Sequence, residues 1–235
     1  KHIPKFYNSK EDLINKLSEK LSGLKIKKEI IEETFEKFDI SDRENFAREL
    51  LKKSKPMLIV ANKIDLIQSQ KNFEKLKNLI NEPLIPASAE AELVLKNLSK
   101  NEIIKYIPGS KTFEILKKEK LTTEQLNALE NLKKIMEKFD GTGVQKALNE
   151  AVFNILKYKA VYPVENENLL SDKEGNILPN VFLLEKNATA LDLAYKIHSD
   201  IGKNFVKALI VNKKKIVGKE YILNHRDVVK IFFKK

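Results

Sequence analysis

The segment spanning residues 57–66 is the feature that most constrains the fold. It reads M-L-I-V-A-N-K-I-D-L, so a short aliphatic run ends abruptly at the polar residues Asn62 and Lys63. An apolar run of this length, entered through Pro56, is typical of a strand buried in a parallel sheet. Open α/β sheets bind ligands beyond the carboxyl ends of their strands. The segment therefore predicts an α/β fold with a ligand-binding loop at Asn62, Lys63 and Asp65.

The side chains of this loop suit one nucleotide base. A guanine edge presents two adjacent N–H donors, and an ionised carboxylate at Asp65 can accept both. Adenine presents an acceptor at the same place, and a bidentate pair discriminates by roughly 1–3 kcal/mol. Asn62 can bond to the base and to a neighbouring loop, and the alkyl chain of Lys63 can lie along the base. The alternative is that N-K-x-D is an ordinary surface turn.

A second loop supports the nucleotide interpretation. Residues 83–87 form another apolar piece, which ends at Ser88 and Ala89. These small residues would let a backbone N–H approach the O6 atom of guanine. An amphipathic helix is expected between the two apolar pieces. Its predicted apolar face consists of Phe73, Leu76 and Leu79. Two strand-end loops with matching chemistry favour a guanine pocket over a chance turn.

Both loops resemble motifs of a known protein class. N-K-I-D at residues 62–65 and S-A-E at residues 88–90 are similar to the fourth and fifth guanine-nucleotide motifs of the translation-factor-like GTPases. More narrowly, S-K-P-M-L-I-V-A-N-K-I-D-L, I-P-A-S-A-E-A-E-L, Y-I-P-G-S and G-T-G-V-Q-K-A-L-N-E-A-V-F resemble the archaeal branch of the Obg-related, YchF-type GTPases. The block from A-T-A-L-D-L-A-Y-K-I-H to H-R-D-V-V-K-I resembles the TGS domain.

The resemblance implies a fold, a ligand and a division into domains. It implies a partial P-loop nucleotide-binding domain with a helical insertion, followed by a β-grasp, ubiquitin-like TGS domain. The expected domains are residues 1–54 for the insertion, 55–156 for the second half of the P-loop domain and 157–235 for the TGS domain. Many YchF-type proteins outside this branch lack an aspartate at the place of Asp65 and prefer ATP. This chain keeps Asp65, so the resemblance implies GTP or GDP.

The phosphate-binding motifs of a GTPase are absent from the sequence. There is no G-x-x-x-x-G-K-[ST], and the first half has no D-x-x-G. The G-T-G at residues 141–143 is expected to be a turn after a helix, because no Lys-Ser/Thr pair follows it. In the family the missing motifs lie N-terminal to this region. We therefore expect the C-terminal portion of a longer GTPase, with Mg²⁺ bound only in the intact protein and no hydrolysis by this chain alone.

Composition narrows the compartment and the partners. The chain has no Cys and three scattered His, so we expect neither disulfides nor a metal site. No apolar run approaches the roughly 20 residues that span a bilayer, so we expect a cytoplasmic protein without a membrane partner. The net charge of +11 favours RNA or the ribosome as a partner. The alternative is a lysine-rich surface that reflects genome composition or a hot habitat.

Three consecutive lysines, Lys213, Lys214 and Lys215, are the best local candidates for phosphate contacts. They are expected at the tip of a hairpin, where an ordinary solvated turn is the alternative. A non-catalytic RNA-binding module that works through its TGS domain is accordingly the second functional hypothesis. An enzyme of another TGS-bearing class is the third. It is disfavoured because grouped His and Cys, or paired His and Asp, are not present in the sequence.

Local signals also predict where several helices begin and end. Gly23 is expected to end the first helix. Ser41 is expected to be an N-cap, with Glu44 at the third helical position. Thr122 or Thr123, and later Thr189, are expected to cap two further helices.

Overall fold

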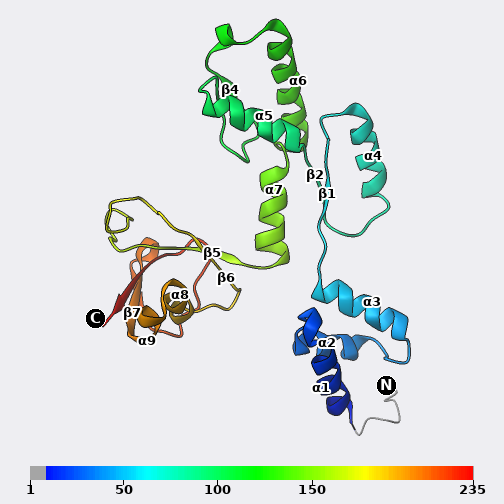
Figure 1. The fold of residues 1–235 in the computed structure, drawn as a ribbon, viewed down its shortest axis with the longest axis vertical. Helices are drawn as coiled ribbons and strands as arrows, with labels where there is room; N and C mark the ends of the chain where they lie inside the picture. The colour runs from blue at the N-terminus through cyan, green and yellow to red at the C-terminus, as the bar shows by residue number, and fades with distance from the viewer. Residues whose placement is uncertain (1–8, 235) are drawn as a thin grey trace. The chain divides into compact units, whose positions relative to one another are not determined.

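The computed structural model describes residues 9–234. The chain divides into two compact units, one ending at Ala147 and the other beginning at Leu148. Figure 1 traces the first unit from blue to green and the second from green to red. The division falls within α7 (Val144–Asn149), somewhat before the domain boundary expected from the sequence at residues 156 and 157.

The first unit begins with a group of three helices. They are α1 (Lys10–Leu21), α2 (Lys28–Lys37) and α3 (Arg43–Ser54). Apolar residues at helical spacing form their shared core, in which the rings of Phe35 and Phe46 pack 4.8 Å apart. The buried members of this core are Leu13, Ile14, Ile26, Ile31, Phe35, Phe46 and Leu50. The helical character expected for this region is therefore present.

Two of the predicted helix ends in this group are wrong. Gly23 lies inside a 3₁₀ turn (Ser22–Leu24), and the left-handed residue that ends it is Lys25, with φ of 56°. Helix α3 is capped by Asp42, whose carboxylate accepts from the Asn45 N–H, and not by Ser41. The hydroxyl of Ser41 bonds instead to Asp39, two residues back. Asp and Ser are comparable N-caps, so when the two are adjacent the sequence does not determine which of them begins the helix.

The next segment contains a parallel strand pair. Strand β1 (Ile59–Ala61) pairs in parallel with β2 (Leu84–Pro86), and α4 (Ile67–Lys77) connects them. Figure 1 shows β1 and β2 side by side. Helix α5 (Ala89–Lys100) follows β2 directly. Among residues 9–234 these two strands pair only with each other, and Val60 at the centre of β1 is 44% exposed.

Only part of the predicted apolar face of α4 is buried. Phe73 is 8% exposed and its ring meets that of Phe139 edge-on, with centroids 6.2 Å apart. Leu76 is 38% exposed, and Leu79 lies beyond the end of the helix at 78% exposed. The periodicity therefore identified the helix, although only Phe73 of its predicted apolar face is buried.

The first unit ends with a hairpin and a long helix. Strands β3 (Ile104–Lys105) and β4 (Glu114–Ile115) are antiparallel, and α6 (Thr123–Phe139) packs near them. Thr122, one of the two threonines predicted as the cap, caps α6 and forms a complete capping box with Gln125. The buried core here consists of Leu95, Ile104, Tyr106, Phe113, Leu129 and Met136.

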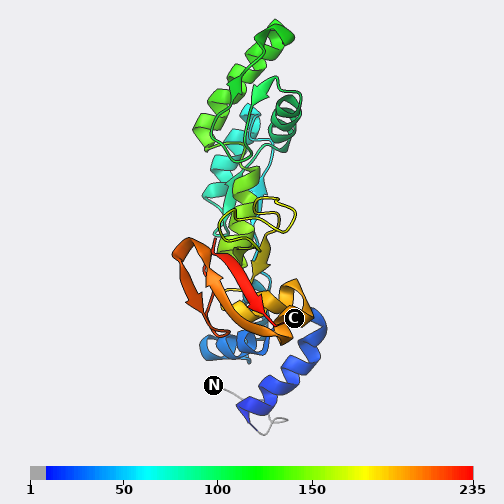
Figure 2. The same ribbon diagram turned by 90° about the vertical axis from the view of Figure 1, so that its left-hand side faces the viewer.

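The second unit is a mixed sheet of five strands with two short helices. Its elements are β5 (Lys159–Pro163), β6 (Phe182–Leu184), α8 (Ala190–Ile197), α9 (Ser199–Lys203), β7 (Phe205–Ile210), β8 (Lys215–Val217) and β9 (Val228–Phe233). A stretch of π-helix (Glu150–Ile155) precedes β5. The order β6-β5-β9-β7-β8, with β5 parallel to β9, is the predicted β-grasp. Figure 2 shows β7, β8 and β9 side by side.

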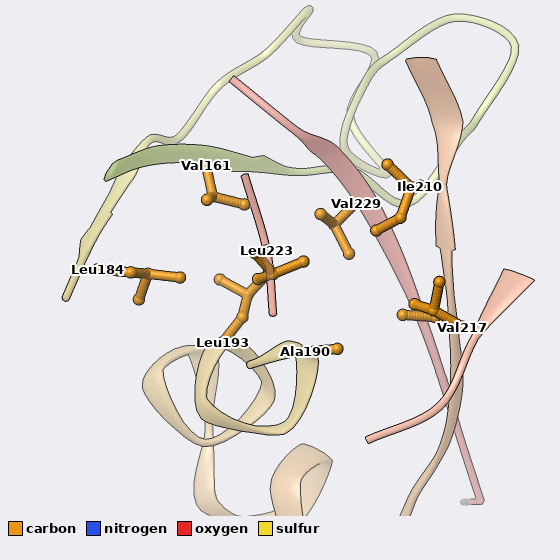
Figure 3. Packing of buried hydrophobic residues seen from close by; sticks show 9 residues of the cluster. Val161, Leu184, Ala190, Leu193, Ile210, Val217, Leu223 and Val229 are labelled. Atoms are coloured by element: carbon orange, nitrogen blue, oxygen red, sulfur yellow. The ribbon is translucent and has the colours of Figure 1, made fainter. Parts of the chain in front are cut away.

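The core of the second unit lies between one sheet face and α8. Figure 3 shows Ala190 and Leu193 of α8 beneath Val161, Val229 and Ile210 of the sheet. Thr189 caps α8 through a capping box, as predicted. Strand β8 was not predicted, because it begins at Lys215, the last residue of a lysine run that is typical of a turn.

No helix within residues 9–234 is long and apolar enough to cross a membrane. The same residues contain no group of three or more His, Cys, Asp or Glu side chains placed to hold a metal ion.

Candidate functional site

The ladder between β1 and β2 continues into the loops that follow them. The Ala87 N–H donates to the carbonyl of Ala61 at 2.9 Å, and the Ile64 N–H donates back to the carbonyl of Ala87 at 3.0 Å. Because the strands are parallel, both loops leave the same edge of the sheet. The loop at residues 62–65 therefore lies directly against the loop at residues 87–89.

The side chain of Asn62 joins the two loops. Its Oδ1 atom accepts from the Lys63 N–H at 2.8 Å and from the Ala89 N–H at 3.1 Å. Lys63 has a left-handed backbone with φ of 64°, which is costly for a residue with a Cβ. The bond from Asn62 supports that conformation, because short polar side chains stabilise such turns. Asn62 thus bonds to the neighbouring loop, as the sequence suggested.

The hydroxyl, the N–H and the carbonyl of Ser88 all form hydrogen bonds that stabilise its own loop. It is 2% exposed and is the N-cap of α5, where its Oγ atom accepts from the Ala91 N–H at 3.1 Å. Its carbonyl accepts from the Glu92 N–H at 3.2 Å, and its own N–H donates to the carbonyl of Thr142 at 2.8 Å. The role of Ser88 in this structure is therefore to shape the loop that presents Ala89.

Asp65 lies beside the first turn of α5. The residue is half-buried, and its Oδ1 atom is buried without a hydrogen bond from any residue that the structure describes. It lines a hollow of about 290 Å³. The other lining residues are Glu90 and Ala91, followed by mostly apolar residues: Val94, Leu98, Leu121, Gln125, Ala128, Leu129 and Leu132. The hollow is thus shared between Asp65 and the residues just after Ala89, while Asn62, Lys63, Ser88 and Ala89 do not line it.

A buried polar cluster behind the second loop escaped the sequence analysis. Glu92 of α5 is 8% exposed, and its Oε2 atom accepts from the hydroxyls of Tyr106 at 2.7 Å and Thr142 at 2.5 Å. Burial, followed by the bond to Glu92, raises the pKa of Tyr106 to about 12. The available signal was a charged residue three positions before Leu95 on the buried face of α5, where charged residues are rare unless paired.

The G-T-G segment packs against the end of β2. Asp140 ends α6 in a left-handed conformation, and the Gly141 N–H donates to the carbonyl of Met136 at 2.8 Å. A Cβ on Gly143 would lie 1.9 Å from the carbonyl oxygen of Pro86, and its φ is +80°. The segment is the turn and cap that the sequence predicted, and only a glycine fits at its third position.

The three lysines of the second unit differ in their surroundings. The Nζ atom of Lys213 lies 2.6 Å from Oδ1 of Asp227, which is 1% exposed. The Nζ atom of Lys215 lies 5.0 Å from the ring centroid of Tyr221. Lys214 is exposed and left-handed at the turn between β7 and β8. All three lysines are exposed, and Lys213 is the one that pairs with a buried carboxylate.

Two parts of this chain match known protein domains. Residues 60–166 match the model of the Obg-like GTPase YGR210-like, G4 motif-containing domain, and residues 173–233 match the TGS domain. An uncharacterised GTP-binding protein of Methanocaldococcus jannaschii is 42% identical over 229 residues, which is 94% of this chain. This part of the chain is similar to the Obg-like GTPases.

A solved GTP-binding protein has a similar fold. The crystal structure of a GTP-binding protein from Pyrococcus horikoshii OT3 matches 94% of this chain with a TM-score of 0.66 and 33% sequence identity. The chain spans 58% of the length of the Methanocaldococcus protein and 61% of the Pyrococcus chain. Both relatives therefore contain segments with no counterpart in this chain.

Proposed function

We propose that this chain is the base-recognising part and TGS domain of an archaeal, YchF-type GTP-binding protein. Asp65 would accept the N1–H and N2–H of guanine, and Asn62 would hold the two loops together beneath the base. Lys63 would cover the base face, and Ser88 would shape the loop so that the Ala89 N–H meets O6. Binding of the phosphates and Mg²⁺, and any GTP hydrolysis, would belong to the intact protein.

The observation that carries this proposal is the carboxylate of Asp65. A buried carboxylate oxygen without a donor costs about 1–3 kcal/mol or more. A ligand with two adjacent N–H groups would supply what the described residues do not. The match to a G4-motif domain over residues 60–166 supports the same role.

The test replaces one of the hydrogen-bond acceptors of the Asp65 side chain with a donor. Asp65→Asn in the intact protein replaces one acceptor with an N–H donor, which suits the 2-oxo group of xanthine better than the 2-amino group of guanine. We expect the Kd for GDP to rise by roughly 10- to 200-fold and that for XDP to fall, measured by calorimetry.

Glu90→Gln is the matched control, because Glu90 lines the same hollow and the change removes the same charge. It should leave the ratio of the two Kd values unchanged. A wild-type protein that binds ADP as tightly as GDP, or an Asp65→Asn variant with unaltered preference, would defeat the proposal.

We also propose RNA, within the ribosome or free, as a partner in the cytoplasm. The observations that favour it are the net charge of +11 and the exposed Lys214 beside Lys215. Each phosphate contact contributes about 0.7–0.9 to the slope of log K against log salt. Lys214→Ala should therefore lower that slope by about 0.7–0.9, measured by filter binding from low to moderate salt. An unchanged slope would show that Lys214 does not contact the phosphates of the RNA.

A further inference from the structure

The buried carboxylate of Glu92 gathers hydroxyls from two distant segments. Tyr106 follows β3, and Thr142 follows α6, yet both donate to the same oxygen, Oε2. All three residues are nearly inaccessible, with 8% exposed for Glu92, 7% for Tyr106 and 3% for Thr142. Three segments of the first unit thus meet at one acceptor.

This cluster is bonded directly to the loop at residues 88 and 89. The backbone of Glu92 donates to the carbonyl of Ser88, and the carbonyl of Thr142 accepts from the N–H of Ser88. Both backbone groups of Ser88 are therefore held by members of the cluster. The next residue, Ala89, presents its N–H to Asn62. The position of that N–H follows from where the cluster fixes Ser88.

The packing around Thr142 leaves little room for adjustment. Gly143 lies so close to β2 that a Cβ would come within 2.9 Å of both the carbonyl carbon and the oxygen of Pro86. The backbone after Thr142 is restricted by the close contact of Gly143 with Pro86. The side chain of Thr142 is restricted by its hydroxyl bond to Glu92.

Stability alone does not account for such a cluster. Replacing buried charged groups by apolar side chains of similar volume is often neutral or stabilising. A hydrogen-bonded cluster with satisfied donors instead specifies one geometry, because each bond is directional. What the cluster fixes here is the backbone of the loop that follows β2.

We propose that Tyr106 and Thr142, acting through Glu92, are positioning residues that set the Ala89 N–H for the 6-oxo group of a bound guanine. The N–H can serve Asn62 and the base together as a shared donor. The inference rests on the proposed guanine site and adds the residues that determine its selectivity at the 6-position.

The test compares ligands that differ at one atom. Kd values for GDP, 6-thio-GDP and IDP are measured for the intact protein and for Tyr106→Phe. 6-Thio-GDP weakens the acceptor at the 6-position, and IDP lacks the 2-amino group that faces Asp65. Loss of one hydrogen bond corresponds to about a three- to tenfold weaker Kd for GDP. We expect the preference for GDP over 6-thio-GDP to shrink towards one, while the preference for GDP over IDP stays unchanged.

A matched pair at Thr142 separates positioning from folding. Thr142→Val removes the hydroxyl and keeps the shape, and should repeat the effect of Tyr106→Phe. Thr142→Ser keeps the hydroxyl and should restore the wild-type preference for GDP over 6-thio-GDP. If the variants lose thermal stability but keep that preference, or lose both preferences equally, the positioning role is overturned. A wild-type protein with no preference for GDP over ADP would instead overturn the proposed guanine site.

Discussion

At the scale of single residues, the carboxylate of Asp227 shows how a surface lysine can be structural. Asp227 is 1% exposed, and its Oδ2 atom accepts from the Asn224 N–H at 2.8 Å. Its Oδ1 atom lies 2.6 Å from Nζ of Lys213. A buried carboxylate that loses its charged partner is destabilising, because its desolvation is no longer offset.

Lys213→Ala should therefore lower the free energy of unfolding of the second unit by about 1–3 kcal/mol. Lys214→Ala is the matched control. Its side chain is exposed, so we expect a change within about 0.5 kcal/mol. Urea unfolding followed by circular dichroism measures both. Equal effects of the two changes would show that the Lys213–Asp227 pair contributes nothing to stability.

Sequence reasoning located the two loops of the proposed site, because their positions depend on local sequence. The loop at residues 62–65 and the turn at Ser88 follow directly from where apolar runs end. Glu92, Tyr106 and Thr142 could not be found in this way, because their bonds join residues 14 and 50 positions apart. Lys213 and Lys214 look alike in sequence, and only the fold places a buried carboxylate beside one of them.

At the scale of elements, the G-T-G turn after α6 shows how one segment constrains another. Gly143 has φ of +80° and meets the backbone of Pro86, while Gly175 has φ of +88° and nothing within 4 Å of a Cβ. The two glycines therefore share a backbone conformation that side chains avoid and differ in the space around them.

Gly143→Ala should cost more stability than Gly175→Ala by about 1–3 kcal/mol, the usual penalty of overpacking. The left-handed backbone penalises both variants alike, so the difference isolates the clash with β2. Denaturant midpoints of the two variants measure it. Indistinguishable midpoints would contradict the close approach of this turn to the strand.

Helix ends were predicted correctly where the sequence contains a strong capping signal. Thr122 and Thr189 begin their helices as predicted, since each has a reciprocal partner three residues later. The sequence predicted Ser41 as the N-cap of α3, but the adjacent Asp42 caps it, because either side chain can serve in that position. Strand β8 is short and polar at its start, and its pairing with β7 defines it.

At the scale of the whole molecule, the second unit has a hydrophobic core of its own. All nine buried members of that core lie between Val161 and Val229. The ring contact between Phe153 and His225, with centroids 4.7 Å apart, also lies within this unit. A domain with its own core can fold alone.

A fragment of residues 148–235 should therefore unfold in one cooperative thermal transition. At about 0.7 kcal/mol per residue, the calorimetric enthalpy at the midpoint would be about 60 kcal/mol. Differential scanning calorimetry measures it, and the fragment of residues 9–147 serves as the comparison. A broad transition without a heat-capacity peak would show that the TGS domain depends on the rest of the chain.

The parallel pair of β1 and β2 has a practical consequence for anyone who handles this protein. Each strand has one side with no ladder partner among residues 9–234, and Met57 and Val60 leave apolar surface beside it. Unpaired strand edges recruit whatever extended backbone is near. We therefore expect a concentrated preparation to turn turbid sooner than a dilute one, which light scattering against protein concentration would measure.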